Sequence, residues 1–250
     1  MNQTVPQSFI DEEIRKDPAN ALSEYGAEFR TDIEAFISMD VLRSCVQSGV
    51  YERPPELRWR YYCFTDPSGG SSDSFTLAIA HKEGNTVVLD LIREVRPPFS
   101  PEQVVEEFAA VVKKYRITKV VGDRYGGEWP RERFRICGLN YELVDLTKSE
   151  IYQALLPIIN SNQAIMLDHD RMVYQFCSLE RRTARGGKDS IDHPPRMHDD
   201  ISDACAGAIV LANTRPSDWS KKTTPYTPFS GGAPPITPYS GPPGESWMRW

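Results

Sequence analysis

The sequence has 250 residues, of which 40% are hydrophobic and 26% are charged, which is enough for one fair-sized core with appendages. Its net charge of −6 excludes a uniformly basic nucleic-acid coat, but is compatible with a local basic groove beside an acidic site. The five cysteines show no C-x-x-C spacing and no apolar stretch resembles a signal peptide or membrane span, which predicts a reducing, cytoplasmic location without a zinc site.

The first 56 residues are predicted to form an acidic, helical lead-in and not a second core. Pro18 and Gly49 interrupt its periodic pieces, and Pro54-Pro55 closes it. This pattern is typical of an accessory subdomain or a linker. The expected helical pieces cover residues 11–16, 19–30 and 40–48.

Three antiparallel strands are predicted next, because the hydrophobic period changes to two residues after Leu57. The first strand stops at Asp66-Pro67, and a glycine turn at residues 83–85 joins the second strand to the third. The expected strands cover residues 58–65, 74–81 and 86–95.

Helices and strands alternate over the rest of the chain up to residue 213. Capping-box patterns at Ser100 and Thr147 open two of the helices. Residues 214–250 are rich in proline, glycine, serine and threonine, which is typical of a disordered tail. Helices are expected over residues 100–115, 128–137, 148–160 and 171–181, and strands over residues 117–123, 141–144 and 165–167.

Basic residues gather between residues 181 and 197, among paired glycines and prolines. Glycine and proline at this density favour a loop, so the segment is predicted to be a basic loop. The loop is either a plain solvated surface or, beside an acidic site, a set of phosphate contacts. Its basic residues are Arg181, Arg182, Arg185, Lys188 and Arg196.

Three carboxylates, from Asp199, Asp200 and Asp203, stand at the start of a predicted apolar helix. At helical spacings of three and four residues they are expected to share one face. Two unit charges about 4 Å apart repel by roughly 4 kcal/mol at an effective dielectric near 20, so solvent, basic side chains or a divalent metal must offset the repulsion. The alternative is that the acidic residues only suit the positive end of the helix dipole.

The order of these elements predicts an α/β, RNase H-like fold, with a mixed sheet of three antiparallel strands followed by parallel strands and flanked by helices. In such a sheet the first and fourth strands are neighbours. Asp66 ends the first strand and Asp123 ends the fourth, so both are expected to meet the acidic helix at one point. Each aspartate alone is compatible with an ordinary turn or strand-end cap. His198, just before the helix, either binds a metal ion or orients a side chain that does. The alternative is a histidine that caps the helix or is exposed to solvent.

A family resemblance is carried by four stretches in the second half of the chain. They look like the C-terminal nuclease domain of the large terminase subunit of tailed bacteriophages. The resemblance covers residues 57 to about 213, and residues 25–30 are similar to the segment that joins that family's ATPase motor to its nuclease. The four stretches are Ser161 to His169, Leu179 to Gly187, Ile191 to Pro195 and His198 to Asp200.

The resemblance implies a Mg- or Mn-dependent endodeoxyribonuclease that cuts concatemeric double-stranded DNA during genome packaging. Two Mg²⁺ or Mn²⁺ ions would support the hydrolysis of the phosphodiester bond. Asp66 and Asp123 would share one ion, and Asp200, with Asp199 or Asp203, would hold the other. Asp203 ranks as supporting, because members often have asparagine there.

The sequence departs from the family in having no G-x-x-x-x-G-K-S/T phosphate loop, so no ATP-driven translocation is expected from this chain. We expect a nuclease-half fragment, the product of a split gene, or a stand-alone relic. The implied partners are double-stranded DNA, an ATPase motor domain or chain, the portal and the small terminase subunit, in the cytoplasm of an infected or lysogenic bacterial host. Two alternatives stay open: another RNase H-like nuclease such as a Holliday-junction resolvase, and a non-catalytic packaging or docking subunit.

Overall fold

A six-stranded sheet runs through the middle of the computed structural model, which describes residues 33–123, 129–183 and 189–214. The strand order is β6-β5-β2-β3-β4-β7; β2, β3 and β4 are antiparallel, and β5, β6 and β7 join in parallel. The predicted mixed sheet is confirmed. Its strands are β2 (Tyr61–Asp66), β3 (Phe75–Glu83), β4 (Thr86–Val95), β5 (Lys119–Gly122), β6 (Asn140–Leu143) and β7 (Ala164–Ile165).

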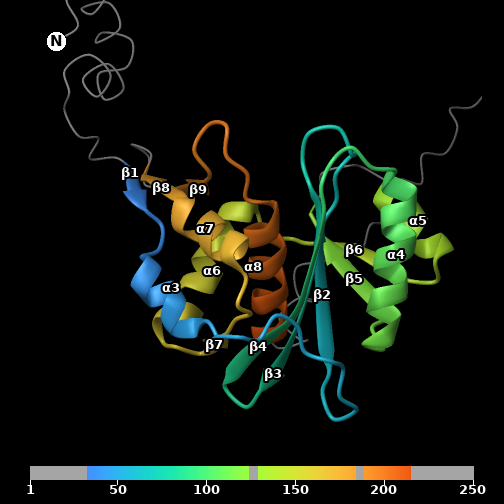
Figure 1. The fold of residues 1–250 in the computed structure, drawn as a ribbon, viewed down its shortest axis with the longest axis horizontal. Coiled ribbons are helices and arrows are strands. Elements are labelled where there is room, and N and C mark those ends of the chain that lie inside the picture. The colour runs from blue at the N-terminus through green and yellow to red at the C-terminus, as the bar shows by residue number, and fades with distance from the viewer. Residues whose placement is uncertain (1–32, 124–128, 184–188, 215–250) are drawn as a thin grey trace, which may run out of the picture.

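Helices cover both faces of this sheet (Figure 1). The helices on one face are α4 (Pro101–Lys114) and α5 (Trp129–Ile136), and those on the other are α3 (Met39–Cys45), α6 (Lys148–Asn160), α7 (Asp170–Ser178) and α8 (Asp200–Asn213). Each face has its own hydrophobic cluster. Because both faces are covered, β3 and β4 are buried along most of their length rather than at alternate positions. Within the described ranges, no helix is long and apolar enough to cross a membrane.

The two predicted capping boxes have different outcomes. At α6, the Thr147 side chain accepts the backbone N–H of Glu150, whose carboxylate accepts the backbone N–H of Thr147 at 2.7 Å. The capping box at Thr147 is therefore confirmed. At α4, Ser100 makes no side-chain capping bond. The proline at the first position of α4, as predicted, removes one N–H that would otherwise need a partner.

The prediction that residues 181–197 form a loop is wrong where two strands of a β-hairpin occupy the segment. Strands β8 (Glu180–Thr183) and β9 (Asp189–Asp192) pair antiparallel, and β8 also pairs with β1 (Ile33–Ala35). Helix α7 ends at Ser178, three residues before the expected end, where the buried Leu179 turns to an extended backbone. The partner strand β1 is far away in the sequence, so no local pattern reveals the pairing.

The described part of the lead-in packs into the core beneath α8. Phe36, Leu42 and Cys45 are buried in the same cluster as α8, and α3 corresponds to the predicted piece at residues 40–48. The Gln47 N–H donates to the carbonyl of Met166 at 3.0 Å, which ties the segment to the end of β7. The boundary near residue 56 stays a prediction, while the pieces at 11–16 and 19–30 and the tail at 215–250 lie outside the described residues.

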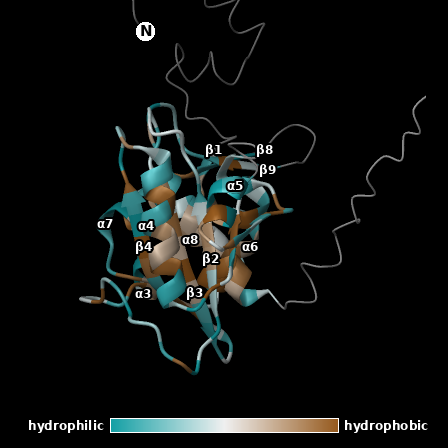
Figure 2. Cartoon of the chain, turned by 90° about the vertical axis from the view of Figure 1, so that its right-hand side faces the viewer, coloured by the Kyte–Doolittle hydropathy of each residue, from teal (hydrophilic) through white to brown (hydrophobic). Residues whose placement is uncertain are grey.

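Helix α8 packs directly on β2 and β3 through small and apolar residues (Figure 2). Gly207 permits the closest approach, since a Cβ atom built there would lie 2.3 Å from Cγ of Phe64. The prediction of a tightly packed apolar helix is confirmed. This contact sets how near the start of α8 lies to the carboxyl end of β2.

The buried His81 of β3, near the turn to β4, is expected to make stability depend on pH. Nδ1 of His81 lies 2.7 Å from Asp90 Oδ2 and Nε2 lies 2.9 Å from Glu83 Oε1, so only the doubly protonated ring donates to both. Burial lowers the pKa of His81, but the two hydrogen bonds and the carboxylate charges raise it by a larger amount. The pKa of His81 in the folded protein therefore lies above its usual value.

A raised histidine pKa means that its contribution is fully present below the unfolded value of about 6.5 and is lost as pH rises through the folded value. We expect the free energy of unfolding in urea to fall over that range, and the Glu83→Gln variant to flatten the fall. Equal pH slopes in the two proteins would contradict the imidazolium assignment.

Candidate active site

Asp66 and Asp123 stand side by side at the carboxyl ends of two neighbouring parallel strands. β2 pairs with β5 so that Thr65 lies opposite Gly122, and the two aspartates are the next residues along each strand. The predicted adjacency of the two strands is confirmed. Gly122 allows the close fit beneath Asp123, because a Cβ there would lie 2.1 Å from the Tyr141 hydroxyl oxygen.

A pocket of about 480 Å³ opens where these strand ends meet α8. Asp66, Asp123 and Asp203 line it, together with Lys148 and apolar residues of the β6–α6 connection. Desolvation raises the pKa of Asp66 well above its usual range, and the charge of Asp203 raises it more than that of any other carboxylate. The pKa of Asp203 is likewise raised, by desolvation and by its neighbour Asp199. Three carboxylates therefore line one pocket, and the charges of Asp203 and Asp123 both disfavour ionisation of Asp66.

Asp200 is not among the residues that line this pocket, but its charge still raises the pKa of Asp66, so the shared face of the three helix carboxylates stays a prediction. Asp200 Oδ2 accepts the backbone N–H of Ser74 at 3.3 Å, and its carboxylate lies in a group with Asp73 and His198. The exposed His198 is 3.5 Å from Asp73 Oδ1 and does not line the pocket. The hydrogen bond from Ser74 to Asp200 joins the loop before β3 to the start of α8, which helical spacing alone does not predict.

Asp199 precedes α8 and faces Lys148 instead of capping the helix. Lys148 Nζ lies 2.6 Å from Asp199 Oδ2 and 3.7 Å from Asp203 Oδ2. Asp199 Oδ2 is buried and has no well-aligned hydrogen-bond donor, so charge attraction is its main contact. Sequence reasoning did not select Lys148. The available signal was its place in the capping box that follows β6, since the ends of neighbouring parallel strands open on the same edge.

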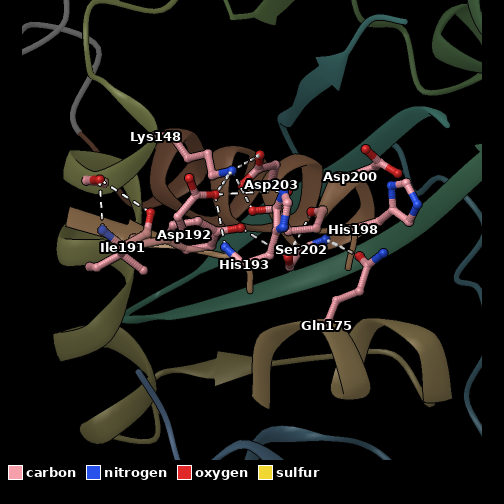
Figure 3. A network of polar contacts seen from close by, with 12 residues as sticks. Lys148, Gln175, Ile191, Asp192, His193, His198, Asp200, Ser202 and Asp203 are labelled. Atoms are coloured by element: carbon pink, nitrogen blue, oxygen red, sulfur yellow. Dashed lines mark hydrogen bonds and ion pairs between the residues drawn. The ribbon is translucent and has the colours of Figure 1, made fainter. Parts of the chain in front are cut away.

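Gln175 of α7 supplies the cap that Asp199 leaves unmade. Its buried side-chain oxygen accepts the backbone N–H groups of Ile201 at 2.9 Å and Ser202 at 3.1 Å (Figure 3). The first backbone N–H groups of α8 therefore have their hydrogen-bond acceptor on α7. The carboxylate of Asp199 is not needed as a helix cap and contacts Lys148 instead. Sequence reasoning missed Gln175, because its partners lie 26 and 27 residues away.

Of the five predicted DNA-contacting residues, the structure describes three, and two of these three are paired with acidic side chains. Arg181 donates to Asp189 through Nε at 2.8 Å, and Arg182 donates to Glu180 at 2.8 Å. Both arginines therefore already have acidic partners on the β8–β9 hairpin. Arg196 is exposed shortly before α8, and Arg185 and Lys188 lie outside the described residues.

The donor set of the pocket fits a hard divalent cation. Asp66, Asp123 and Asp203 offer oxygen atoms alone, which suit Mg²⁺ and Mn²⁺ better than softer metals. Desolvation and mutual repulsion raise the pKa of Asp66 and of Asp203, and a bound cation would relieve both costs. The three residues come from β2, from the end of β5 and from α8, so the fold itself assembles the set.

No protein-family model matches this chain, and no curated protein sequence matches it. Solved structures do. The large terminase nuclease of thermophilic phage G20c with bound magnesium superposes with a TM-score of 0.59 at 16% identity, over 70% of this chain and 98% of that one.

Two further structures extend the comparison. One is the nuclease domain of the large terminase subunit gp2 of bacterial virus Sf6, a mutant with manganese and beta-thujaplicinol. It superposes with a TM-score of 0.56 at 11% identity, over 70% of this chain and 98% of that one. The other is the HK97 bacteriophage large terminase, which superposes with a TM-score of 0.58 at 14% identity, over 85% of this chain and 52% of that one. At these identities the likeness concerns the fold, and the described residues have the RNase H-like fold of large terminase nuclease domains from phages.

Proposed function

We propose that this chain is a metal-dependent endodeoxyribonuclease that acts as the nuclease half of a phage terminase large subunit. The observation that carries the proposal is the meeting of Asp66, Asp123 and Asp203 in one pocket, at the strand ends where the fold places them. Phage terminase nucleases with the same fold have been crystallised with magnesium and manganese, which supports a divalent ion here.

In the proposed reaction, Asp66 and Asp123 hold the ion from the sheet and Asp203 holds it from α8. Divalent ions, of which the family resemblance implies two, would activate the attacking water and stabilise the leaving 3′ oxygen of the cut strand. Asp203, which lines the pocket, is the helix carboxylate that the pocket supports best, while the roles expected for Asp199 and Asp200 as ligands stay predictions. Asp200 instead fixes the loop before β3 against the start of α8.

The proposed substrate is concatemeric double-stranded DNA, cut during genome packaging. An acidic chain needs local positive charge to bring a phosphate to such a pocket. We assign this task to Arg196 and to the basic residues of the β8–β9 region, namely Arg181, Arg182, Arg185 and Lys188. Contacts of this kind position the duplex and carry little sequence information.

The proposed partners follow from the same assignment. We propose that an ATPase motor domain or chain, the portal and the small terminase subunit work with this nuclease in the host cytoplasm. Residues 1–56 are proposed to act as the connection to the motor. The match to 52% of the HK97 large terminase is consistent with a chain that corresponds to one part of such a protein.

Plasmid cleavage tests the proposal directly. Supercoiled DNA should be nicked and linearised with Mn²⁺ or Mg²⁺ and should stay intact with EDTA. Asp123→Asn is the matched negative control, because it changes one pocket carboxylate into an amide of the same size. A preference for four-way junctions over duplex DNA would instead favour a resolvase. Absence of cleavage with either ion would favour a non-catalytic docking subunit.

Metal binding is expected to release protons. Desolvation and the neighbouring carboxylates raise the pKa of Asp66 and Asp203, so the metal-free fold holds protons that the unfolded chain would lose. The metal-free protein therefore loses stability as pH rises from the ordinary carboxylate range through these raised values, and Mn²⁺ should bind more tightly over the same range.

Calorimetry in two buffers of different ionisation enthalpy, at one pH, measures this proton release. The apparent binding enthalpy should differ between the buffers for the wild type. The difference should shrink in Asp203→Asn, which has one proton fewer to release. Identical enthalpies in the two buffers for the wild type would contradict the raised pKa values.

A further inference from the structure

A second hollow, of about 730 Å³, lies at the amino ends of β2 and β5. The first residues of these two strands line it, whereas the candidate active site follows their last residues. Leu143 of β6 and Leu211 and Thr214 at the end of α8 complete its walls. This amino-end groove is therefore a different surface from the pocket of carboxylates, although Asp145 lines both.

The amino-end groove is rich in aromatic and exposed apolar side chains. Leu57 is 85% exposed and Leu143 is 37% exposed, so apolar carbon reaches solvent at two of its walls. The guanidinium of Arg60 lies 5.5 Å from the centre of the Tyr62 ring. Grooves lined by aromatic rings are the surfaces on which proline-rich segments dock. The aromatic residues of the groove are Trp59, Tyr61, Tyr62 and Tyr115.

The charges of the amino-end groove are mixed, which disfavours a nucleic-acid strand as its occupant. Nζ of Lys119 lies 2.8 Å from Glu142 Oε2, and Arg116 donates to the carbonyl oxygen of Glu56 at 3.1 Å. Asp145 adds a negative charge to the wall. Single-stranded nucleic acid binds along grooves with an excess of positive charge. A neutral or weakly basic polypeptide fits these walls better.

The described residues end at this groove, and a proline-rich sequence follows them. Thr214 lines the groove, and residues 215–250 come next in the chain. A unit of threonine, proline and an aromatic residue occurs three times there, and Lys221-Lys222 precedes the first unit. Each unit places a ring beside a proline, in a sequence that favours the polyproline conformation. The three units are residues 224–226, 227–229 and 237–239.

We propose that residues 224–239, called the tail segment below, dock in the amino-end groove of their own chain. The rings of the tail segment would pack on the aromatic and leucine side chains of the groove, and Lys221-Lys222 would face the acidic Glu142 and Asp145. A segment that cannot build a core of its own still orders when it binds a surface. The proposal does not depend on the nuclease function.

The tether between groove and tail segment favours docking within one chain. Ten residues lead from Thr214 to Thr224, and a stretch of this length spans at most about 36 Å, with a root-mean-square span of roughly 16–19 Å for a flexible linker. Such a linker gives an effective concentration on the order of millimolar. Contacts with an intrinsic Kd on the order of 0.1 mM would therefore keep most chains docked.

Photo-crosslinking in the full chain tests the proposal. With p-benzoylphenylalanine in place of Leu143, irradiation at low protein concentration should join the groove to the tail segment of the same chain, as read by mass spectrometry of the digest. Replacing the three rings together, by Tyr226→Ala, Phe229→Ala and Tyr239→Ala, should lower the yield about tenfold or more, because aromatic anchors carry most of the affinity of such contacts.

Two further variants serve as controls. The same photo-reactive residue in place of Ile136 probes a side chain that is 65% exposed on α5, across the sheet from α8, and should capture little of the tail segment (Figure 1). Leu57→Asp changes a groove residue that is 85% exposed, so the fold is preserved, and it should lower the crosslink yield at position 143.

The remaining outcomes assign the groove differently. Equal yields at positions 143 and 136, or a yield that the three alanine changes leave unaltered, would overturn the docking of the tail segment. In a mixture of ¹⁵N-labelled and unlabelled chains, a majority of crosslinks between chains would make a second copy the occupant. Stronger crosslinking to an added single-stranded oligonucleotide than to the tail segment would assign the groove to nucleic acid. None of these results alters the plasmid-cleavage test of the nuclease proposal.

Discussion

Asp203→Asn is expected to lower Mn²⁺-dependent plasmid cleavage on the order of a thousandfold or more, whereas Asp200→Asn should lower it by only about 10–100-fold. The reason is geometric. Asp203 lines the pocket with Asp66 and Asp123, while Asp200 accepts a hydrogen bond from the Ser74 backbone and supports the loop. Initial rates of supercoiled-plasmid loss, measured at saturating Mn²⁺, give the comparison.

The same variants should also behave differently without metal. Asp66→Asn and Asp203→Asn each replace a buried carboxyl group, whose ionisation the fold disfavours, by a neutral amide, so the melting temperature in EDTA should stay level or rise. A loss of cleavage with a preserved fold then reflects the site and not unfolding. Wild-type cleavage by Asp203→Asn, together with inactivity of Asp200→Asn, would return the catalytic role to Asp200.

Gly207→Ala is expected to destabilise the protein by about 3 kcal/mol, despite the better helix propensity of alanine. The new Cβ would meet the buried ring of Phe64 at 2.3 Å, and the ring is packed in the core between α8 and β2. Helix α8 must then move away from the sheet, which also displaces Asp203 from Asp66. Urea denaturation should show the loss, and Mn²⁺ affinity should fall with it.

Two controls separate this clash from a general effect of losing glycine. Gly69→Ala adds a Cβ that meets nothing within 4 Å, so its stability should stay within about 0.5 kcal/mol of the wild type. Phe64→Leu combined with Gly207→Ala should cost less than the sum of the two single changes, because the smaller side chain makes room for the methyl group. Strict additivity would show that the ring contact is not the cause.

The sheet and the pair of strand-end aspartates could be predicted because local patterns encode them. β4 occupies the predicted residues 86–95, since a glycine turn starts it and the proline pair at 97–98 follows its end. The neighbouring positions of Asp66 and Asp123 followed from the order of the elements, because that order determines which strands pair.

The features that the sequence did not reveal depend on contacts between distant segments. The β8–β9 hairpin looked like a loop, because its third strand β1 lies about 145 residues earlier in the chain. The hydrogen bond from the Ser74 backbone to Asp200 joins two elements 126 residues apart, so no local pattern reveals it. Lys148 and Gln175 were missed for the same reason, since a lysine at a helix start and a glutamine within a helix carry no local sign of their distant partners.

The outermost strands of the central sheet have a consequence for the behaviour of the chain at high concentration. β6 has four residues and β7 has two, whereas the central strands β3 and β4 have nine and ten. Short edges offer a second copy few unpaired backbone groups for strand addition, so the folded protein resists aggregation through its sheet. The long apolar hairpin at the centre is the aggregation-prone element, and it is exposed only when α8 and α4 have not yet packed. Aggregation during expression therefore reports on incomplete packing of these helices, and refolding yields should improve at low protein concentration.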